Sequence, residues 1–216
     1  FENVFFEQRK QVRDRVKFFL EHRDWYEKKG IPYTLGFMFH GPPGTGKTSS
    51  IKAIANAGRR HIINIQLSEV KTKQQLQHLF FNDEIHVFNG VNTEKYNIPV
   101  AERLYVIEDI DAMGDVVLRR EWKKPVVEEK KKEEDPFGDR KQEEKDTFDL
   151  SFLLNLLDGT LEANGRIIAF SSNYPERIDK ALIRPGRVDM IVHFKNCSRA
   201  VLKEMVDAFY EQDVAI

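Results

Sequence analysis

One eight-residue stretch constrains this chain more than any other. Residues 41–48 read Gly-Pro-Pro-Gly-Thr-Gly-Lys-Thr and fit the pattern G-x-x-x-x-G-K-[ST], in which glycines let successive backbone N–H groups face an anion. An apolar run at 36–40 predicts a strand before it, and the periodicity of 49–57 predicts a helix after it. This context favours a nucleotide phosphate loop over the alternative, an ordinary Gly/Pro turn. The residues expected to bind the nucleotide are Gly41, Pro42, Pro43, Gly44, Thr45, Gly46, Lys47, Thr48 and Ser49.

Acidic residues follow another apolar run, at 104–107. The sheets of α/β proteins present their ligand-binding groups at such strand ends. Lys47 is expected to reach the β- and γ-phosphates of ATP. From their order on the strand, we predict that Glu108 holds Mg²⁺ together with the Thr48 hydroxyl, and that Asp109 activates the attacking water. Asp111 is compatible with part of either role or with a structural cap. The alternative is that these acids only make the surface soluble.

A polar strand end and a Pro-Gly turn complete the candidate catalytic residues. Asn173 ends another apolar run, and its neutral amide is suited to holding water or the γ-phosphate; the alternative is a simple turn residue. Arg184 and Arg187 flank a Pro-Gly turn, which displays guanidinium groups in a way suited to phosphate. An ion pair with Asp179 or Asp189 is the alternative for these arginines.

Strand-like and helix-like segments alternate along the chain, which predicts an α/β fold with a parallel sheet flanked by helices. Helical periodicity is clearest at 7–23 and 149–159. An Asn-Gly pair at 89–90 predicts a hairpin-like insertion over 84–100. The five segments that predict sheet strands are 36–40, 61–67, 103–111, 166–173 and 189–194.

Composition narrows the possible partners. The chain has 34 Lys and Arg against 35 Asp and Glu, so it lacks the basic excess expected of a nucleic-acid or anionic-membrane binder. No apolar run approaches the about 18 residues that a membrane span requires. Within 119–146, 20 of 28 residues are charged, ten of each sign, and we expect a mobile surface insertion rather than a helix with paired charges. Cys197 is the single cysteine, which favours an intracellular reducing compartment.

Taken together, these motifs resemble the AAA ATPases, whose fold is a P-loop α/β domain followed by a helical lid. The closest resemblance is to the branch of the mitochondrial complex III assembly chaperone, which translocates the Rieske iron–sulfur protein, and to its viral-type relatives. It covers roughly residues 1–210, apart from 84–100 and 119–146. The stretches that carry it are WYEKKGIPYTLGFMFHGPPGTGKTSSI, IEDID, LLNLLDG and ALIRPGRVD.

The resemblance implies roles for the motif residues and a division of the chain. Residues 1–196 are expected to form the large ATPase domain, and 197–216 only the beginning of the lid. Asn173 matches the γ-phosphate sensor of the family. Arg184 and Arg187 match arginines that reach into the neighbouring subunit's site in a ring.

The chain also departs from the threading members of that family. Residues 68–73 carry no aromatic residue where those unfoldases have an aromatic-Gly pore loop, which argues against an unfoldase. The mitochondrial members carry a membrane anchor and a further domain before the ATPase module. The mitochondrial inner membrane is therefore the expected location only if such an anchor precedes this chain.

The leading hypothesis is a Mg-dependent ATPase module of a ring-forming chaperone or translocase. The resemblance implies a hexamer or heptamer when the protein is full length, acting on a protein substrate that the sequence does not identify. The alternative is a nucleic-acid motor or a clamp-loader-type ATPase, but the charge balance and the lack of Arg-rich or aromatic-studded stretches weigh against it. A third possible function is a regulatory module that binds ATP without hydrolysing it. The intact acids and Asn173 weigh against this function.

Overall fold

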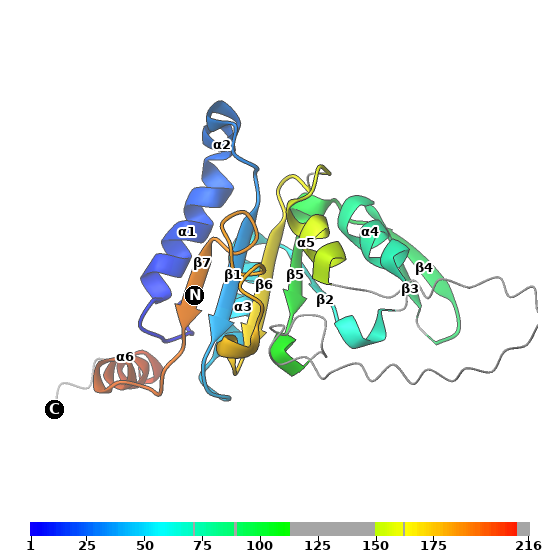
Figure 1. The fold of residues 1–216 in the computed structure, drawn as a ribbon. Coiled ribbons are helices and arrows are strands. Elements are labelled where there is room, and N and C mark those ends of the chain that lie inside the picture. The colour runs from blue at the N-terminus through cyan, green and yellow to red at the C-terminus, as the bar shows by residue number, and fades with distance from the viewer. Residues whose placement is uncertain (71, 89, 113–149, 162, 211–216) are drawn as a thin grey trace, which may run out of the picture.

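A computed structural model gives the three-dimensional structure of most of the chain (Figure 1). The charged segment 119–146 lies outside the described residues, so its expected mobility stays a prediction. No helix in the described part combines the length and apolarity that a membrane crossing requires. The residues that the structure describes are 1–70, 72–88, 90–112, 150–161 and 163–210.

A five-stranded sheet forms the centre of the fold, as the alternating pattern predicts. The strand order is β2-β5-β6-β1-β7, and every neighbouring pair is parallel. The carboxyl ends of all five strands therefore lie at the same edge of the sheet, where the phosphate loop and the acidic residues follow them. The strands are β1 (Leu35–His40), β2 (His61–Asn64), β5 (Arg103–Ile107), β6 (Ile167–Ser172) and β7 (Met190–His193).

Helices cover both faces of the sheet, because its central strands bury side chains on both sides. Phe37 and Phe39 of β1 pack into one hydrophobic core, whereas Met38 between them packs into the other. The first core includes residues of three helices, and the second includes residues of two; Figure 1 shows the sheet between these layers. The first three are α1 (Arg9–Glu21), α2 (Arg23–Lys29) and α3 (Lys47–Gly58), and the other two are α4 (Lys73–Phe81) and α5 (Leu150–Asp158).

Three elements end earlier than the sequence predicts. Strand β5 ends at Ile107 rather than at the predicted 111, because the backbone turns at Asp109, whose φ is 46°. The helix predicted over 7–23 is α1, which ends at Glu21. His22 leaves the helical conformation, and its ring stacks on Phe18 at a ring-centroid distance of 4.4 Å. The chain then continues as α2, which the sequence pattern did not predict. Strand β2 is shorter than the predicted 61–67, because Leu67 turns into the second core within a short 3-10 helix.

The predicted hairpin is present as an antiparallel pair, β3 (Glu84–Phe88) and β4 (Thr93–Asn97). Both strands lie within the predicted insertion 84–100. The hairpin follows α4, on the opposite side of the molecule from the C-terminal helix (Figure 1). Its base is held by Arg103, whose buried guanidinium donates to the carbonyl oxygens of Ile98 and of the end of α4.

The last helix in the described part is α6 (Arg199–Phe209). Ser198 caps it, accepting a 3.3 Å hydrogen bond from the backbone N–H of Val201. Its assignment to a lid domain stays a prediction. The apolar residues of α6 that stay exposed are Leu202, Met205, Val206 and Phe209.

Candidate nucleotide-binding site

The loop at residues 41–46 links β1 to α3 at the carboxyl edge of the sheet. Gly41 has a φ of 141°, and a Cβ atom there would lie 2.0 Å from the carbonyl oxygen of Phe194, so this turn requires glycine. Gly46, with a φ of 100°, leads directly into the first turn of α3. The unpaired N–H groups and positive end of the α3 dipole therefore face this loop, which suits it to an anion.

Lys47 is buried in the loop, with 8% of its surface exposed. Its Nζ donates to the carbonyl oxygens of Gly41 at 2.7 Å and Pro42 at 2.8 Å, and to Oδ1 of Asn173 at 2.8 Å. Burial lowers the pKa of Lys47, and the nearby charges of Asp109 and Asp111 oppose this shift. The three donors of the ammonium group are thus all used, and they link the loop to the end of β6.

Thr48 and Glu108 form the second contact between the loop and β5. The Thr48 hydroxyl donates to Oε1 of Glu108 at 2.5 Å, so the two predicted metal ligands are direct neighbours. Hydroxyl and carboxylate oxygens are the donors that Mg²⁺ prefers, so these residues fit the ion. No other acid or histidine cluster suited to a metal occurs among the described residues.

Asp109 has an unusual backbone conformation at the end of β5. Its φ is 46°, in the left-handed region that non-glycine residues seldom adopt. Its backbone N–H donates to Oγ of Ser171 at 3.1 Å, and its Oδ1 accepts a 3.1 Å hydrogen bond from Nδ2 of Asn173. The predicted water-activating acid and the predicted sensor amide are therefore in direct contact.

Asp111 lies behind this pair, in the 3-10 turn Ile110–Ala112. Its Oδ1 accepts hydrogen bonds from the Ser172 hydroxyl at 2.5 Å and from the Asn173 backbone N–H at 3.1 Å. Asp111 is 8% exposed, and these two hydrogen-bond partners lie at the end of β6 or directly after it. It therefore contacts neither the loop nor Thr48 through a hydrogen bond within the described residues.

The arginine turn packs against β1 rather than against the phosphate loop. Oδ2 of Asp189 accepts from the Gly36 backbone N–H at 2.8 Å. Arg187 forms a two-point ion pair with Asp158 at 2.7 and 2.8 Å, whereas Arg184 is exposed. The sequence analysis gave an ion pair with Asp179 or Asp189 as the alternative. An ion pair does form at Arg187, but its partner is Asp158. Within the described part of the chain, neither guanidinium bonds to the loop or its acids.

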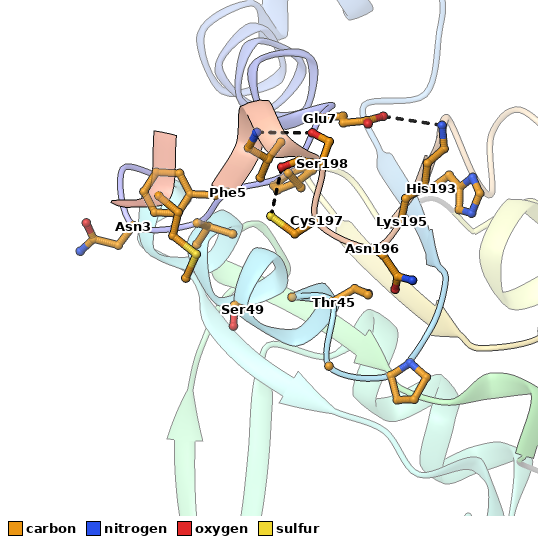
Figure 2. Close-up of a pocket in the computed structure, with 17 residues that line it drawn as sticks. Asn3, Phe5, Glu7, Thr45, Ser49, His193, Lys195, Asn196, Cys197 and Ser198 are labelled. Carbon is orange, nitrogen blue, oxygen red and sulfur yellow. Dashed lines mark hydrogen bonds and ion pairs between the residues drawn. The ribbon is translucent and has the colours of Figure 1, made fainter. Parts of the chain in front are cut away.

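A cavity of about 400 Å³ adjoins the loop, between the N-terminal segment 3–7 and the start of α6 (Figure 2). Thr45, Ser49, Cys197 and Ser198 are among its lining residues, together with loop residues 43–46. The sequence analysis did not predict this cavity, because its walls come from segments far apart in the chain. Its volume lies within the range typical of small-molecule sites.

A stacked histidine pair at the same sheet edge was also missed. The rings of His40 and His193 lie 4.5 Å apart and nearly parallel, at the ends of β1 and β7. His193 lines the cavity, whereas His40 directly precedes the loop. Two histidines 153 positions apart carry no joint signal in one sequence, so only the strand register reveals the pair.

The pattern of one protein family matches most of the chain. Residues 37–196 match the family described as "ATPase family associated with various cellular activities (AAA)". The chain belongs to the AAA family. The matched range runs from β1 to the residue before Cys197, and so contains the phosphate loop, both strand-end acids, Asn173 and the arginine turn.

Three curated AAA relatives are each 32% identical in sequence to this chain. The "Mitochondrial chaperone BCS1" of Bos taurus is 32% identical over 200 residues, 92% of this chain and 40% of the relative. The "Probable mitochondrial chaperone bcs1" of Schizosaccharomyces pombe is 32% identical over 203 residues, 94% of this chain and 37% of the relative. The Arabidopsis thaliana "Protein HYPER-SENSITIVITY-RELATED 4" is also 32% identical over 203 residues, 93% of this chain and 31% of the relative.

The chain therefore spans about a third to two fifths of the length of these AAA relatives. The similarity to chaperones of this type agrees with the resemblance inferred from the motifs. AAA membership implies nucleotide binding and ATP hydrolysis as the general activity of the fold.

Proposed function

We propose that this chain binds MgATP and hydrolyses it to ADP and phosphate, as the ATPase module of a ring-forming chaperone that moves or remodels a protein substrate. The observation that carries the proposal is the Asn173 side chain, which contacts Lys47 through its oxygen and Asp109 through its nitrogen. One amide thus links the residue assigned to the phosphates with the residue assigned to the water.

Binding is supported by the donors gathered at the loop. Lys47 donates to two loop carbonyls and to Asn173, and phosphate oxygens are stronger acceptors than these groups. We infer that Lys47 exchanges the loop carbonyls for the β- and γ-phosphates when ATP binds. The nucleoside then occupies the neighbouring cavity of about 400 Å³, beside Thr45, Ser49 and Cys197 (Figure 2).

Hydrolysis requires a base for the attacking water and donors for the phosphoryl group. We assign the base to Asp109, whose carboxylate keeps one oxygen for water while Asn173 donates to the other. Lys47 stabilises charge on the transferring phosphoryl group. Thr48 and Glu108 would hold Mg²⁺, which when bound neutralises charge on the phosphates.

The quaternary part of the proposal rests on the arginine turn. Arg184 is exposed and has no bond to the phosphate loop of its own chain within the described residues, which supports a role at the site of a neighbouring subunit. A ring of six or seven subunits supplies such a neighbour. Because curated relatives are named mitochondrial chaperones, a mitochondrial association is included in the proposal.

Alkylation of Cys197 tests nucleotide binding without requiring turnover. Cys197 is exposed on the cavity and is the single cysteine of the chain, so iodoacetamide labels one position. ATP should slow the alkylation of the wild-type chain, and Lys47→Ala should remove that protection and weaken the binding of a fluorescent ATP analogue. Lys52→Ala, on the same helix but outside the loop, is the matched control. Equal protection in the Lys47 and Lys52 variants would refute the phosphate-loop assignment.

A further inference from the structure

The buried carboxylate of Asp111 has no part in the proposed contacts with nucleotide, metal or water. It lies two residues beyond Asp109, with 8% of its surface exposed. Burying a carboxylate is costly unless hydrogen bonds compensate for the lost water. Both hydrogen bonds that Asp111 Oδ1 accepts come from the end of β6, one from the Ser172 hydroxyl and one from the Asn173 backbone N–H.

The Asn173 N–H requires such an acceptor because of its position. Strand β6 pairs with β5 as far as Phe170 and with β1 as far as Ser172, so Asn173 lies beyond both ladders. Asp111 satisfies this donor at 3.1 Å. The same carboxylate holds the Ser172 hydroxyl at 2.5 Å, and that oxygen accepts the next backbone N–H, from Tyr174, at 3.0 Å. Three consecutive residues are thereby tied to one carboxylate.

The Asn173 amide itself admits a single orientation. Lys47 has only donors, so it must face the amide oxygen, and the ionised Asp109 has only acceptors, so it must face the amide nitrogen. This orientation is maintained only if the Asn173 backbone holds its place. Asp111 is itself fixed, because Ile110 before it is fully buried in the second core.

We propose that Asp111 is a positioning residue of the hydrolytic site, which acts through Ser172 and the Asn173 backbone to keep the Asn173 amide between Lys47 and Asp109. The inference rests on the proposed function for its effect on turnover. Its structural part, the dependence of Asn173 on Asp111, does not require that the protein hydrolyses ATP.

The kinetic test compares Asp111→Ala with Asp111→Asn in the ring-forming protein. The alanine variant loses the acceptor, and kcat should fall about 10- to 100-fold with little change in ATP affinity. The asparagine variant keeps an acceptor oxygen for Ser172 and Asn173, and should retain most of the wild-type kcat. An asparagine variant as slow as the alanine variant would show that charge, rather than positioning, is what Asp111 contributes.

A double-mutant cycle separates positioning from a general loss of structure. If Asp111 acts through Asn173, Asp111→Ala should lower kcat no further in an Asn173→Ala background. Additive losses would overturn the proposal. If Asp111→Ala fails to fold, Ser172→Ala replaces it, because that change removes one of the two links between the carboxylate and β6.

A second readout is independent of turnover. The side-chain NH₂ signals of Asn173, identified by their loss in Asn173→Ala, should exchange slowly with water in the wild-type chain and faster in Asp111→Ala. Unchanged Asn173 signals in Asp111→Ala would refute the inference even if kcat falls. A wild-type protein that shows the protected signals but no ATP hydrolysis would instead count against the proposed function alone.

Discussion

At the scale of single residues, the site is a set of short polar contacts between three strand ends. Lys47 follows the loop after β1, Asp109 follows β5 and Asn173 follows β6. The parallel sheet brings them together although Asn173 lies 126 positions from Lys47 and 64 from Asp109. The sequence could predict these residues, because Lys47 belongs to the phosphate-loop pattern that follows one apolar strand, while Asp109 and Asn173 come at the ends of two others. It could not predict that Asn173 touches both of the others, because that depends on strand register and on the turned backbone of Asp109.

The Thr48–Glu108 contact leads to a prediction about metal dependence. Glu108→Gln should raise the Mg²⁺ concentration needed for tight ATP binding, because an amide is a weaker ligand for Mg²⁺ than a carboxylate. Titrating ATP affinity against Mg²⁺ in the wild-type and variant proteins measures the shift. Glu102→Gln, an exposed acid before β5, serves as control. If Glu108→Gln leaves the Mg²⁺ requirement unchanged and an Asp109 variant raises it, the two acids have the reverse roles.

From the stacked pair of His40 and His193, we predict that the free energy of unfolding depends on pH. Burial lowers the pKa of His40, and the charges of His193 and Lys47 lower it further, whereas Glu176 opposes the shift. The pKa of a histidine in an unfolded chain is about 6.5, higher than that of His40 in the folded chain. As the pH falls, the unfolded chain therefore binds the proton before the folded chain does. Stability should therefore decrease from about pH 6.5 down to the lower pKa of the folded state, and change no further below it.

Urea unfolding between about pH 5 and pH 8 measures this effect. His40→Phe keeps a ring to stack on His193 but cannot titrate, so this part of the pH dependence should disappear. His61→Asn, on the exposed edge strand β2, should retain it. An identical pH dependence in the wild-type and His40→Phe chains would show that His40 does not cause this part of the pH dependence.

At the scale of elements, the β3–β4 hairpin depends on one buried arginine. Arg103 is fully buried, and its guanidinium donates to the carbonyl oxygens of Ile98, Leu79, Asn82 and Asp83 at 2.7 to 2.8 Å. These carbonyls belong to the end of α4 and to the two ends of the hairpin. Arg103 therefore ties the hairpin base to β5.

Arg103→Met should lower the free energy of unfolding by about 2–4 kcal/mol, because it removes the guanidinium donors from four partly buried carbonyls. Denaturant unfolding monitored by circular dichroism measures the loss. The matched control is Lys95→Met, an exposed cation on β4, which should change little. Equal stabilities of the two variants would mean that the guanidinium does not hold the hairpin base.

The sequence predicted most elements but fewer of their ends. Apolar strands bounded by turn residues carry a strong signal, so all five sheet strands were expected. The end of α1 depends on the stacking of Phe18 on His22, and the end of β2 on the burial of Leu67. Such tertiary contacts override local periodicity, which is why α2 was missed. The buried Arg103 was missed because a charged residue that starts a strand gives no sign of its carbonyl partners.

At the scale of the whole molecule, the two arginines of the Pro-Gly turn differ. The Arg187 side chain is 11% exposed and paired with Asp158, so it stabilises its own subunit. Arg184 is exposed and can reach another chain without breaking a described contact. The structure of one chain thus makes Arg184 the better candidate for acting on ATP bound to a neighbouring subunit.

Mixing two inactive variants tests the proposed ring arrangement. Arg184→Ala and Asp109→Asn should each be nearly inactive, since such an arginine contributes about 10³–10⁵ in turnover. In mixed rings, some interfaces pair an intact Asp109 site with an intact Arg184, so activity should partly return. If mixed rings form and no turnover appears at any ratio, Arg184 does not act between subunits.

The central claim is that Lys47, Asp109 and Asn173 form a site that hydrolyses ATP, and Asp109→Asn tests it most directly. ATP affinity and phosphate release are measured on the same preparation of wild-type and variant protein. The account predicts that the variant binds MgATP about as tightly as the wild type, while turnover falls by about 10²–10⁴, the usual contribution of a general base. Wild-type turnover in the variant, or a loss of ATP binding as complete as in Lys47→Ala, would contradict it.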